Sequence, residues 1–130
     1  MLLNLSNHPT PTWPEAQRRA ALERFGKLDD LPFPQISPHA GLEQIEALAE
    51  AYLAKVLYRQ AGAGSRFAVH LMGEMTFTYT LANLLRSRGI PCFASTTERT
   101  VTEEKDGRKV SHFHFIRFRP YYPTAVSPNT

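Results

Sequence analysis

The chain has 130 residues, of which 42% are hydrophobic, and this length and composition indicate one globular domain with a substantial core. Fifteen lysines and arginines against twelve acidic residues give a net charge of +3, which permits a phosphate-bearing ligand but argues against a coat of long nucleic acid. The single cysteine, Cys92, excludes an intrachain disulfide, and no apolar run reaches the length of a membrane span. We therefore expect a cytoplasmic protein that contacts no membrane.

The N-terminal segment predicts a strand followed by a helix. Residues 1–5 form an apolar run that ends in the polar turn 6–9, where Pro9 cannot continue a strand ladder. The spacing of Thr12 and Glu15 is that of a capping box, so we expect a helix to begin there and to end at Phe25.

A second strand and the longest helix come next. The segment 28–33 predicts a short strand, and Pro32 and Pro34 indicate either an edge position or an early exit from the sheet. Ser37-Pro38 predicts the start of a helix whose apolar face continues to Leu57.

The middle of the chain has the pattern of a β-α-β unit. Residues 67–72 read as a buried strand, 73–76 as a turn, 77–88 as an amphipathic helix and 90–94 as a second buried strand, which the polar segment 95–99 follows. Parallel strands of this kind place their carboxyl ends at one edge, where ligands of open α/β sheets bind.

The last part of the chain predicts a β-hairpin. Residues 100–104 and 110–119 flank a turn that contains Asp106-Gly107, a pair that favours tight primed turns. The predicted fold class is α/β: a Rossmann-like, mostly parallel sheet with helices on both faces and this hairpin at one edge. We expect a single domain over residues 1–122 and a disordered tail over 123–130.

The turn Gly73-Glu74-Met75-Thr76 is the first candidate ligand site. Glycine allows close backbone approach, and the free N–H groups of a helix start bind phosphate or another anion. The alternative is a plain turn in which Thr76 caps the helix. Neither a dinucleotide-binding nor a P-loop motif is present, so we expect no cofactor.

Ser95, Thr96, Thr97, Glu98 and Arg99 form the second candidate, directly after a buried strand. Three hydroxyls, a carboxylate and a guanidinium suit hydrogen bonding to phosphate, ribose or a base edge. The alternative is a polar turn at the end of a strand, with the two charged groups in solvent.

Histidines mark two further positions. Ser6, Asn7 and His8 form the third polar cluster, in which the imidazole could act as a general acid or base or, alternatively, hold the turn. His112 and His114 share one face of the last strand, but they have no nearby cysteine or acidic partner, so we expect no metal site.

Aromatic and basic residues alternate on the last strand, at Phe113, Phe115, Arg117, Phe118 and Arg119. This alternation could form a nucleic-acid surface, a dimer interface or part of the core, and we favour one of the last two.

Several of these motifs together resemble a known family. The strand that ends in NHP, the Gly-acid turn GEMTF, the segment ASTTER and the hairpin that finishes FIRFRPY are similar to the stand-alone ring nucleases of type III CRISPR systems, which are related to CARF (CRISPR-associated Rossmann fold) domains. The resemblance covers most of the chain. It implies a homodimer that binds a cyclic oligoadenylate, with cyclic tetra-adenylate the first candidate, in a pocket of two-fold symmetry.

The resemblance also implies a reaction. In metal-free ribonucleases the ribose 2′-hydroxyl attacks the adjacent phosphorus, and the protein supplies positioning and charge stabilisation. On this basis Arg99 and the backbone of 73–76 would bind phosphate, 95–97 would contact ribose or phosphate, and His8 or Glu74 would transfer protons. Two alternatives stay open: a module that only sequesters the nucleotide, and a partner-binding protein that uses the aromatic hairpin.

Overall fold

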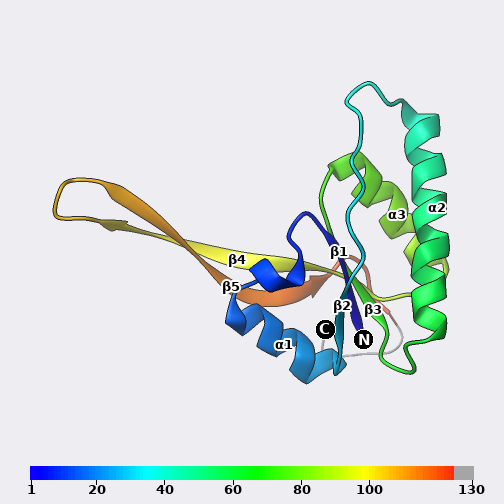
Figure 1. The fold of residues 1–130 in the computed structure, drawn as a ribbon, viewed down its shortest axis with the longest axis horizontal. Coiled ribbons are helices and arrows are strands. Elements are labelled where there is room, and N and C mark those ends of the chain that lie inside the picture. Colours follow the sequence, from blue (N-terminus) through cyan, green and yellow to red (C-terminus); the bar gives the residue numbers. More distant parts are fainter. Residues whose placement is uncertain (125–130) are drawn as a thin grey trace.

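The computed structural model describes residues 1–124 and confirms the α/β fold class (Figure 1). One five-stranded sheet has the order β2-β1-β3-β4-β5, in which every pair is parallel except the antiparallel β4–β5 hairpin. The expected tail falls mostly on residues 125–130, outside the described part. In chain order the elements are β1 (Leu2–Ser6), the 3₁₀-helix η1 (Thr10–Thr12), α1 (Glu15–Phe25), β2 (Leu28–Asp30), α2 (Leu42–Ala61), β3 (Ala68–Met72), α3 (Met75–Ser87), β4 (Cys92–Glu103) and β5 (Lys109–Pro120).

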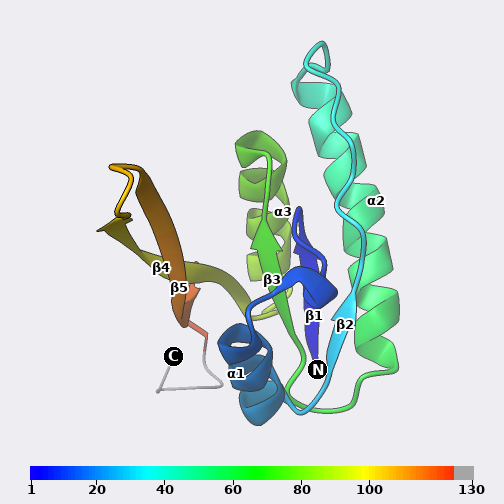
Figure 2. The ribbon, with the colours of Figure 1, turned by 60° about the vertical axis from the view of Figure 1, so that its left-hand side comes forward.

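The helices cover the two faces of the sheet unequally. α1 lies on one face, and α2 and α3 pack together on the other (Figures 1 and 2). Because side chains alternate along a strand, β1 sends Leu3 and Leu5 to the α2–α3 face and Leu2, Asn4 and Ser6 to the α1 face. All five side chains are buried, so this strand is part of both layers.

The core on the α1 face is small and rich in aromatic rings. Its buried members come from α1 and the segment before it, from β1 and β3, and from the two strands of the hairpin: Leu2, Trp13, Ala21, Phe25, Ala68, Phe93 and Phe118. The ring of Phe25 meets those of Phe93 and Phe118 edge to face, at centroid distances of 5.6 and 6.3 Å. These contacts fix α1 against the point where β4 and β5 leave the body of the domain.

The β4–β5 hairpin extends beyond the rest of the sheet (Figure 1). Its outer part, residues 98–114, is called the arm below. Phe113 on the arm is 63% exposed, and Ile116 near its base is 53% exposed. A register shift between Thr96 and Thr97 leaves Ile116 without a partner on β4, as in a β-bulge.

The predicted elements are confirmed, with corrections at several of their ends. β2 ends at Asp30, short of the expected residue 33, and α3 begins at Met75, within the expected turn 73–76. The expected helix start at Ser37 is wrong: α2 begins at Leu42, after the N-cap Gly41, whose backbone N–H donates to the Gln44 side chain at 2.5 Å. The expected capping box is also wrong, because Thr12 lies in η1 and its hydroxyl donates to the Pro9 carbonyl at 2.7 Å.

A further correction concerns β4. The strand was expected to end at residue 94, with the polar segment 95–99 beyond it, but β4 continues to Glu103 and pairs with β5 along its length. No helix in the described part of the chain is long and apolar enough to cross a membrane.

Candidate functional site

The carboxyl edge of β1 and β3 opens into a cleft that we call the α1 cleft. It has a volume of about 660 Å³, within the range of small-molecule sites. Its lining includes members of all three predicted polar clusters: Ser6, Asn7 and His8, then Gly73, then Ser95 and Thr97. The three segments therefore meet at one edge of the sheet, and Trp13, which precedes α1, and Gln17 of α1 close the cleft.

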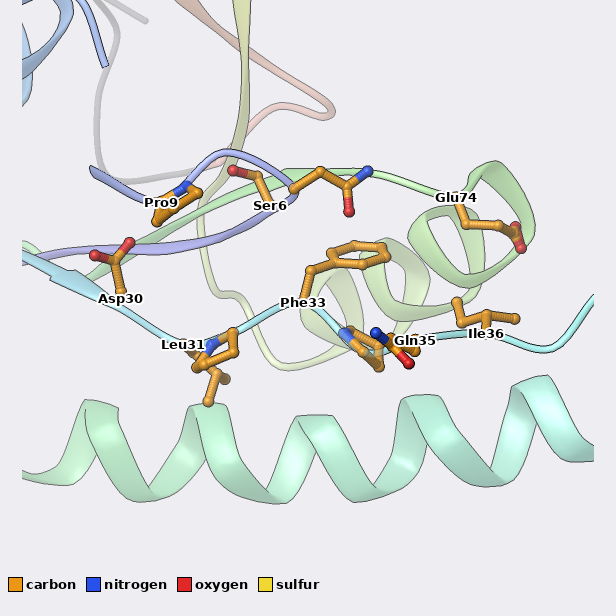
Figure 3. Close-up of a pocket in the computed structure, with 11 residues that line it drawn as sticks. Ser6, Pro9, Asp30, Leu31, Phe33, Gln35, Ile36 and Glu74 are labelled. Carbon is orange, nitrogen blue, oxygen red and sulfur yellow. The ribbon is translucent and has the colours of Figure 1, made fainter. Parts of the chain in front are cut away.

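A second cleft lies on the other side of Ser6 and Asn7, between β1 and the loop that follows β2 (Figure 3). It is larger, about 850 Å³, but Pro32, Phe33 and Pro34 line most of one wall. Its charged side chains are two carboxylates, Asp30 and Glu74. Because carboxylates repel phosphate and prolines offer no N–H donor, the α1 cleft is the better candidate for an anionic ligand.

A network of buried polar side chains forms the floor of the α1 cleft. Asn4 donates to the carboxylate of Asp30 and to the carbonyl of His8, both at 2.8 Å, and its amide oxygen accepts from Ser6 at 2.8 Å. The same oxygen lies 2.8 Å from Nδ1 of His70. On the far side of the imidazole, Nε2 lies 3.1 Å from the hydroxyl of Ser95.

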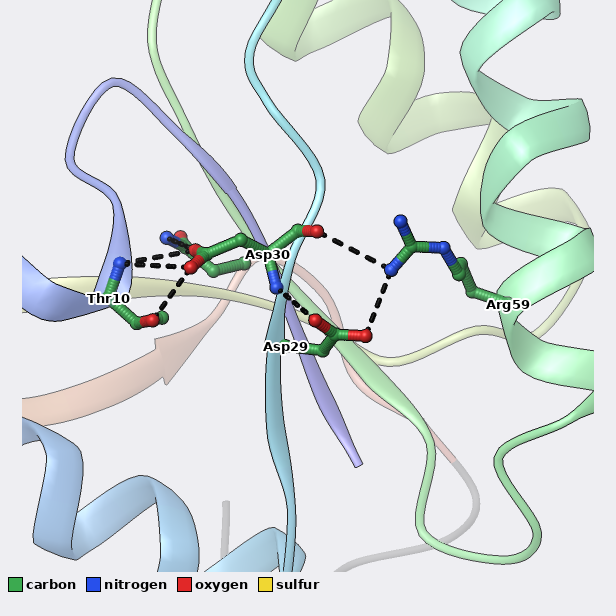
Figure 4. A network of polar contacts seen from close by, with 5 residues as sticks. Thr10, Asp29, Asp30 and Arg59 are labelled. Carbon is green, nitrogen blue, oxygen red and sulfur yellow. Dashed lines mark hydrogen bonds and ion pairs between the residues drawn. The ribbon is translucent and has the colours of Figure 1, made fainter.

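Asp30 ties this network to the loop after β1 (Figure 4). Its carboxylate accepts from the backbone N–H of Thr10 at 3.1 Å and from the Thr10 hydroxyl at 2.7 Å. The adjacent Asp29 pairs with Arg59 of α2 at 3.0 Å. The loop that carries Asn7 and His8 is thus held at both ends while these two side chains stay exposed.

His70 is neutral in this setting. The side chain is 2% exposed, and burial, with a smaller contribution from His8, lowers its pKa to about 4. The ring of Trp13 contacts it edge to face at a centroid distance of 5.0 Å, and the Trp13 indole N–H donates to the His8 carbonyl at 2.8 Å. Sequence analysis placed His70 inside a strand and gave it no role, since the register that aligns it with Asn4 is not visible in the sequence.

The helix start at residues 73–76 is occupied by its own carboxylate. Glu74 is the N-cap of α3: it accepts from the backbone N–H groups of Thr76 and Phe77, the second at 3.2 Å, and from the Thr76 hydroxyl at 2.5 Å. These bonds, the Thr76 hydroxyl foremost, lower the pKa of the Glu74 carboxyl. Two of the N–H groups at this helix start, those of Thr76 and Phe77, are therefore already satisfied, and Met75 points away at 83% exposure.

Residues 95–99 alternate between the two faces of β4. Ser95, Thr97 and Arg99 share the face of Phe118, Phe115 and Phe113, so the cleft continues outward along the arm. Arg99 lies four residues beyond Ser95, about 13 Å along the strand, and donates to Ser111 at 3.0 Å. Thr96 and Glu98 face the opposite side, where the Thr96 hydroxyl donates to the Arg117 carbonyl at 3.3 Å.

Sequence analysis missed Gln17, which lines the α1 cleft from α1. The residue is only 6% exposed, and its amide can both donate to and accept from a ligand. A polar residue in the first turn of an alanine-rich helix was the available signal. No lysine or arginine lines either cleft within residues 1–124, and no three metal-ligating side chains cluster there.

Comparison with known proteins gives one informative match. The model of the family described as "Uncharacterized protein MJ1673 family" matches residues 1–119. The chain belongs to the MJ1673 family. The match includes all five strands of the MJ1673-family sheet except the last residue of β5, and every residue of the α1 cleft. No curated protein and no solved structure matches the chain.

Proposed function

We propose that the protein is a metal-independent ring nuclease that binds a cyclic oligoadenylate in the α1 cleft and cleaves it by attack of a ribose 2′-hydroxyl on the adjacent phosphorus. The observation that carries the proposal is the α1 cleft itself, which joins hydroxyl, amide and imidazole groups from three strand ends with aromatic rings from the arm. We also propose that the protein acts in the cytoplasm, in type III CRISPR defence.

The cleft offers matching groups for each part of an adenylate. The rings of Phe113 and Phe115 provide stacking faces for a base, and Gln17 can pair with the hydrogen-bonding edge of adenine. Ser95 and Thr97 supply hydroxyl groups for ribose or phosphate oxygens. These groups bind a nucleotide by shape and hydrogen bonding, which explains how a cleft with few cations can still take a phosphodiester.

His8 and Arg99 would provide the charge. His8 lies exposed beside the cleft, close enough to transfer a proton to a leaving oxygen. Arg99 would reach the ligand's phosphates from the arm. For Glu74 the cap of α3 is the better supported role, because both carboxylate oxygens bond to Thr76 and the side chain faces the other cleft.

A homodimer would complete the pocket. A cleft of about 660 Å³ suits one nucleotide, whereas a ring of four adenylates with two-fold symmetry requires two such clefts. Phe113 and Ile116 expose apolar surface on and near the arm, where a second copy could pack. Light scattering should give twice the chain mass, and Phe113→Ser with Ile116→Ser should shift it toward the monomer.

The deciding experiment is to incubate the purified protein with cyclic tetra-adenylate and cyclic hexa-adenylate in EDTA and to separate the products by chromatography. More than one ring converted per dimer, to linear products with a 2′,3′-cyclic phosphate, is the expected result. His8→Ala should slow the reaction, whereas the matched control His39→Ala, an exposed histidine outside both clefts, should not.

Two other outcomes would point to different functions. Rings that remain intact but co-elute with the protein would indicate a sequestering module. If neither binding nor cleavage occurs, the exposed arm becomes the better functional surface, since Phe113 at 63% exposure is unusual for an aromatic ring without a partner. A partner-binding protein would then lose its partner when Phe113 and Ile116 are replaced.

A further inference from the structure

Three polar residues lie in one row across the α1 face of the sheet. Strand pairing aligns Asp30 on β2 with Asn4 on β1, and Asn4 with His70 on β3. His70 pairs in turn with Phe93 on β4, so Ser95, two residues further on, lies on the same face. Asn4 and His70 are 1% and 2% exposed, and both His70 and Ser95 line the α1 cleft.

The hydrogen-bond partners determine which ring nitrogen of His70 carries the proton. Both amide hydrogens of Asn4 are used, because they point to the His8 carbonyl and the Asp30 carboxylate, which can only accept. The Asn4 oxygen must therefore accept from Nδ1–H of His70. The imidazole is neutral, so its Nε2 has a free lone pair.

That lone pair points at Ser95. The Ser95 hydroxyl lies 3.1 Å from Nε2 and 3.2 Å from the sulfur of Met72, and the imidazole nitrogen is the stronger acceptor. A serine that donates to a neutral histidine, which an amide or carboxylate orients through its other nitrogen, is the arrangement that activates hydroxyl groups in many unrelated enzymes.

We propose that Ser95, His70 and Asn4 form a proton relay, in which Ser95 is the catalytic residue that takes the proton of the attacking hydroxyl and His70 and Asn4 are its positioning residues. The identity of the attacking hydroxyl, a ribose 2′-hydroxyl, rests on the proposed function. The relay itself rests on the geometry of the three side chains.

In the proposed step the ribose 2′-hydroxyl displaces the 5′-oxygen from phosphorus. The 2′-oxygen forms a bond to phosphorus, and the bond from phosphorus to the 5′-oxygen breaks, with its electron pair leaving on that oxygen. The 2′-hydroxyl proton passes to the Ser95 oxygen as the Ser95 proton passes to Nε2 of His70, and the 5′-oxygen takes a proton from the His8 imidazolium. The products carry a 2′,3′-cyclic phosphate and a 5′-hydroxyl, and exchange with water resets both histidines.

The surroundings of His70 suit this role. Its ring is held by Trp13 and by Phe118, whose centroid lies 5.7 Å away, so it cannot turn away from Ser95. The charged groups that face it are few: His8 from the loop after β1, and Asp30 beyond Asn4. Two hydroxyls of this network line the cleft: Ser6 bonds to the Asn4 oxygen, and Ser95 lies against the free imidazole nitrogen, so Ser95 is the hydroxyl that His70 can activate.

A covalent probe tests the relay without any nucleotide. In diisopropyl fluorophosphate an activated serine oxygen attacks phosphorus, fluoride leaves with the electron pair of its bond, and the serine proton passes to histidine. Mass spectrometry should find Ser95 modified in the wild-type protein. His70→Gln should reduce the modification rate at least tenfold, and the exposed Ser87 should stay unmodified.

Ring cleavage gives the second measurement. Ser95→Ala should slow single-turnover cleavage by about 10²-fold or more, as expected for loss of a general base. The dissociation constant for the ring should rise by about tenfold at most, as for one lost hydrogen bond, and therefore by less than the cleavage rate falls. Ser87→Ala should match the wild type. The acidic limb of kcat/KM against pH should lie near pH 4; a limb near 6.5, the value of a free imidazole, would overturn the assignment of His70.

The outcomes separate the two proposals. If no ring is cleaved but Ser95 is modified in a His70-dependent way, the relay stands and the proposed substrate is wrong. If Ser95→Ala cleaves rings at the wild-type rate, the ring nuclease stands and the relay is overturned. If Ser95 resists the probe in the wild-type protein, the relay is overturned whether or not His70→Gln folds.

Discussion

Burial of neutral His70 should make the stability of the protein depend on pH in a defined way. The pKa of His70 is about 4 in the folded chain, against about 6.5 for an unperturbed imidazole in the unfolded chain. As the pH falls below 6.5, the unfolded state therefore binds this proton first. The contribution of His70 to stability is fully present above pH 6.5 and is lost as the pH falls toward 4.

The size of the loss follows from the two pKa values. Between pH 7.5 and pH 5 the free energy of unfolding should fall by about 2 kcal/mol through this one group, and by about 3 kcal/mol at pH 4. Below pH 4 both states are protonated, so the contribution of His70 should then stop changing.

Urea unfolding at several pH values, followed by the fluorescence of Trp13, measures this directly, since Trp13 is the only tryptophan and is 5% exposed. Carboxylates also titrate in this range, so the quantity to compare is the difference between the wild type and His70→Gln. That difference should change by about 3 kcal/mol between pH 7.5 and 4. Parallel losses in the two proteins would refute the view that burial keeps His70 neutral.

Three further predictions concern α3 and the turn before it. Glu74→Ala should lower the free energy of unfolding by about 1 kcal/mol through loss of the N-cap, and its rate of ring cleavage should stay within twofold of the wild type. A hundredfold loss of kcat would instead show that Glu74 takes part in the reaction. Gly73→Ala should cost about 1–3 kcal/mol in urea unfolding, because a Cβ there would overlap the Phe33 ring, and adding Phe33→Leu should recover part of that loss; additive losses would count against this overlap. Thr78→Val should stabilise by about 1 kcal/mol in thermal unfolding, since the buried Thr78 hydroxyl has no partner within the described residues, and a lower Tm would contradict this.

The sequence was sufficient to predict a sheet with helices on both faces, and to predict that the candidate site lies at the carboxyl edge of the parallel strands. The apolar runs of β1 and β3, and the turns that follow them, mark the strand ends without any knowledge of the register. The alternative that Thr76 caps α3 was wrong, although the turn between β3 and α3 was placed correctly. In the structure Glu74 is the cap, and the Thr76 hydroxyl bonds to it.

The length of β4 could not be predicted, because residues 95–99 are polar on both sides of the strand. Polarity after a buried run usually indicates a turn, but here the partner strand β5 is also largely exposed, so neither face of the arm needs apolar residues. The contact between Asn4 and His70 could not be predicted for a different reason. Asn4 and His70 are single polar residues in apolar strands, and only the register of β1 against β3 places them in contact.

The continuity of β4 connects the site to the arm in one element. Ser95 and Thr97 lie in the cleft and Arg99 lies on the same face further out, so any movement of the arm also moves the groups that line the cleft. Phe93 and Phe118 anchor the base of the hairpin against α1, and the unpaired Ile116 marks the point beyond which the two strands lose that support. A second copy packed against the arm would therefore fix both the distance of Arg99 from the cleft and the orientation of Phe113 over it. The proposed homodimer would thus account both for the exposed apolar side chains of the arm and for the absence of lysine and arginine from the lining of the cleft within the described residues, because two chains would complete one site.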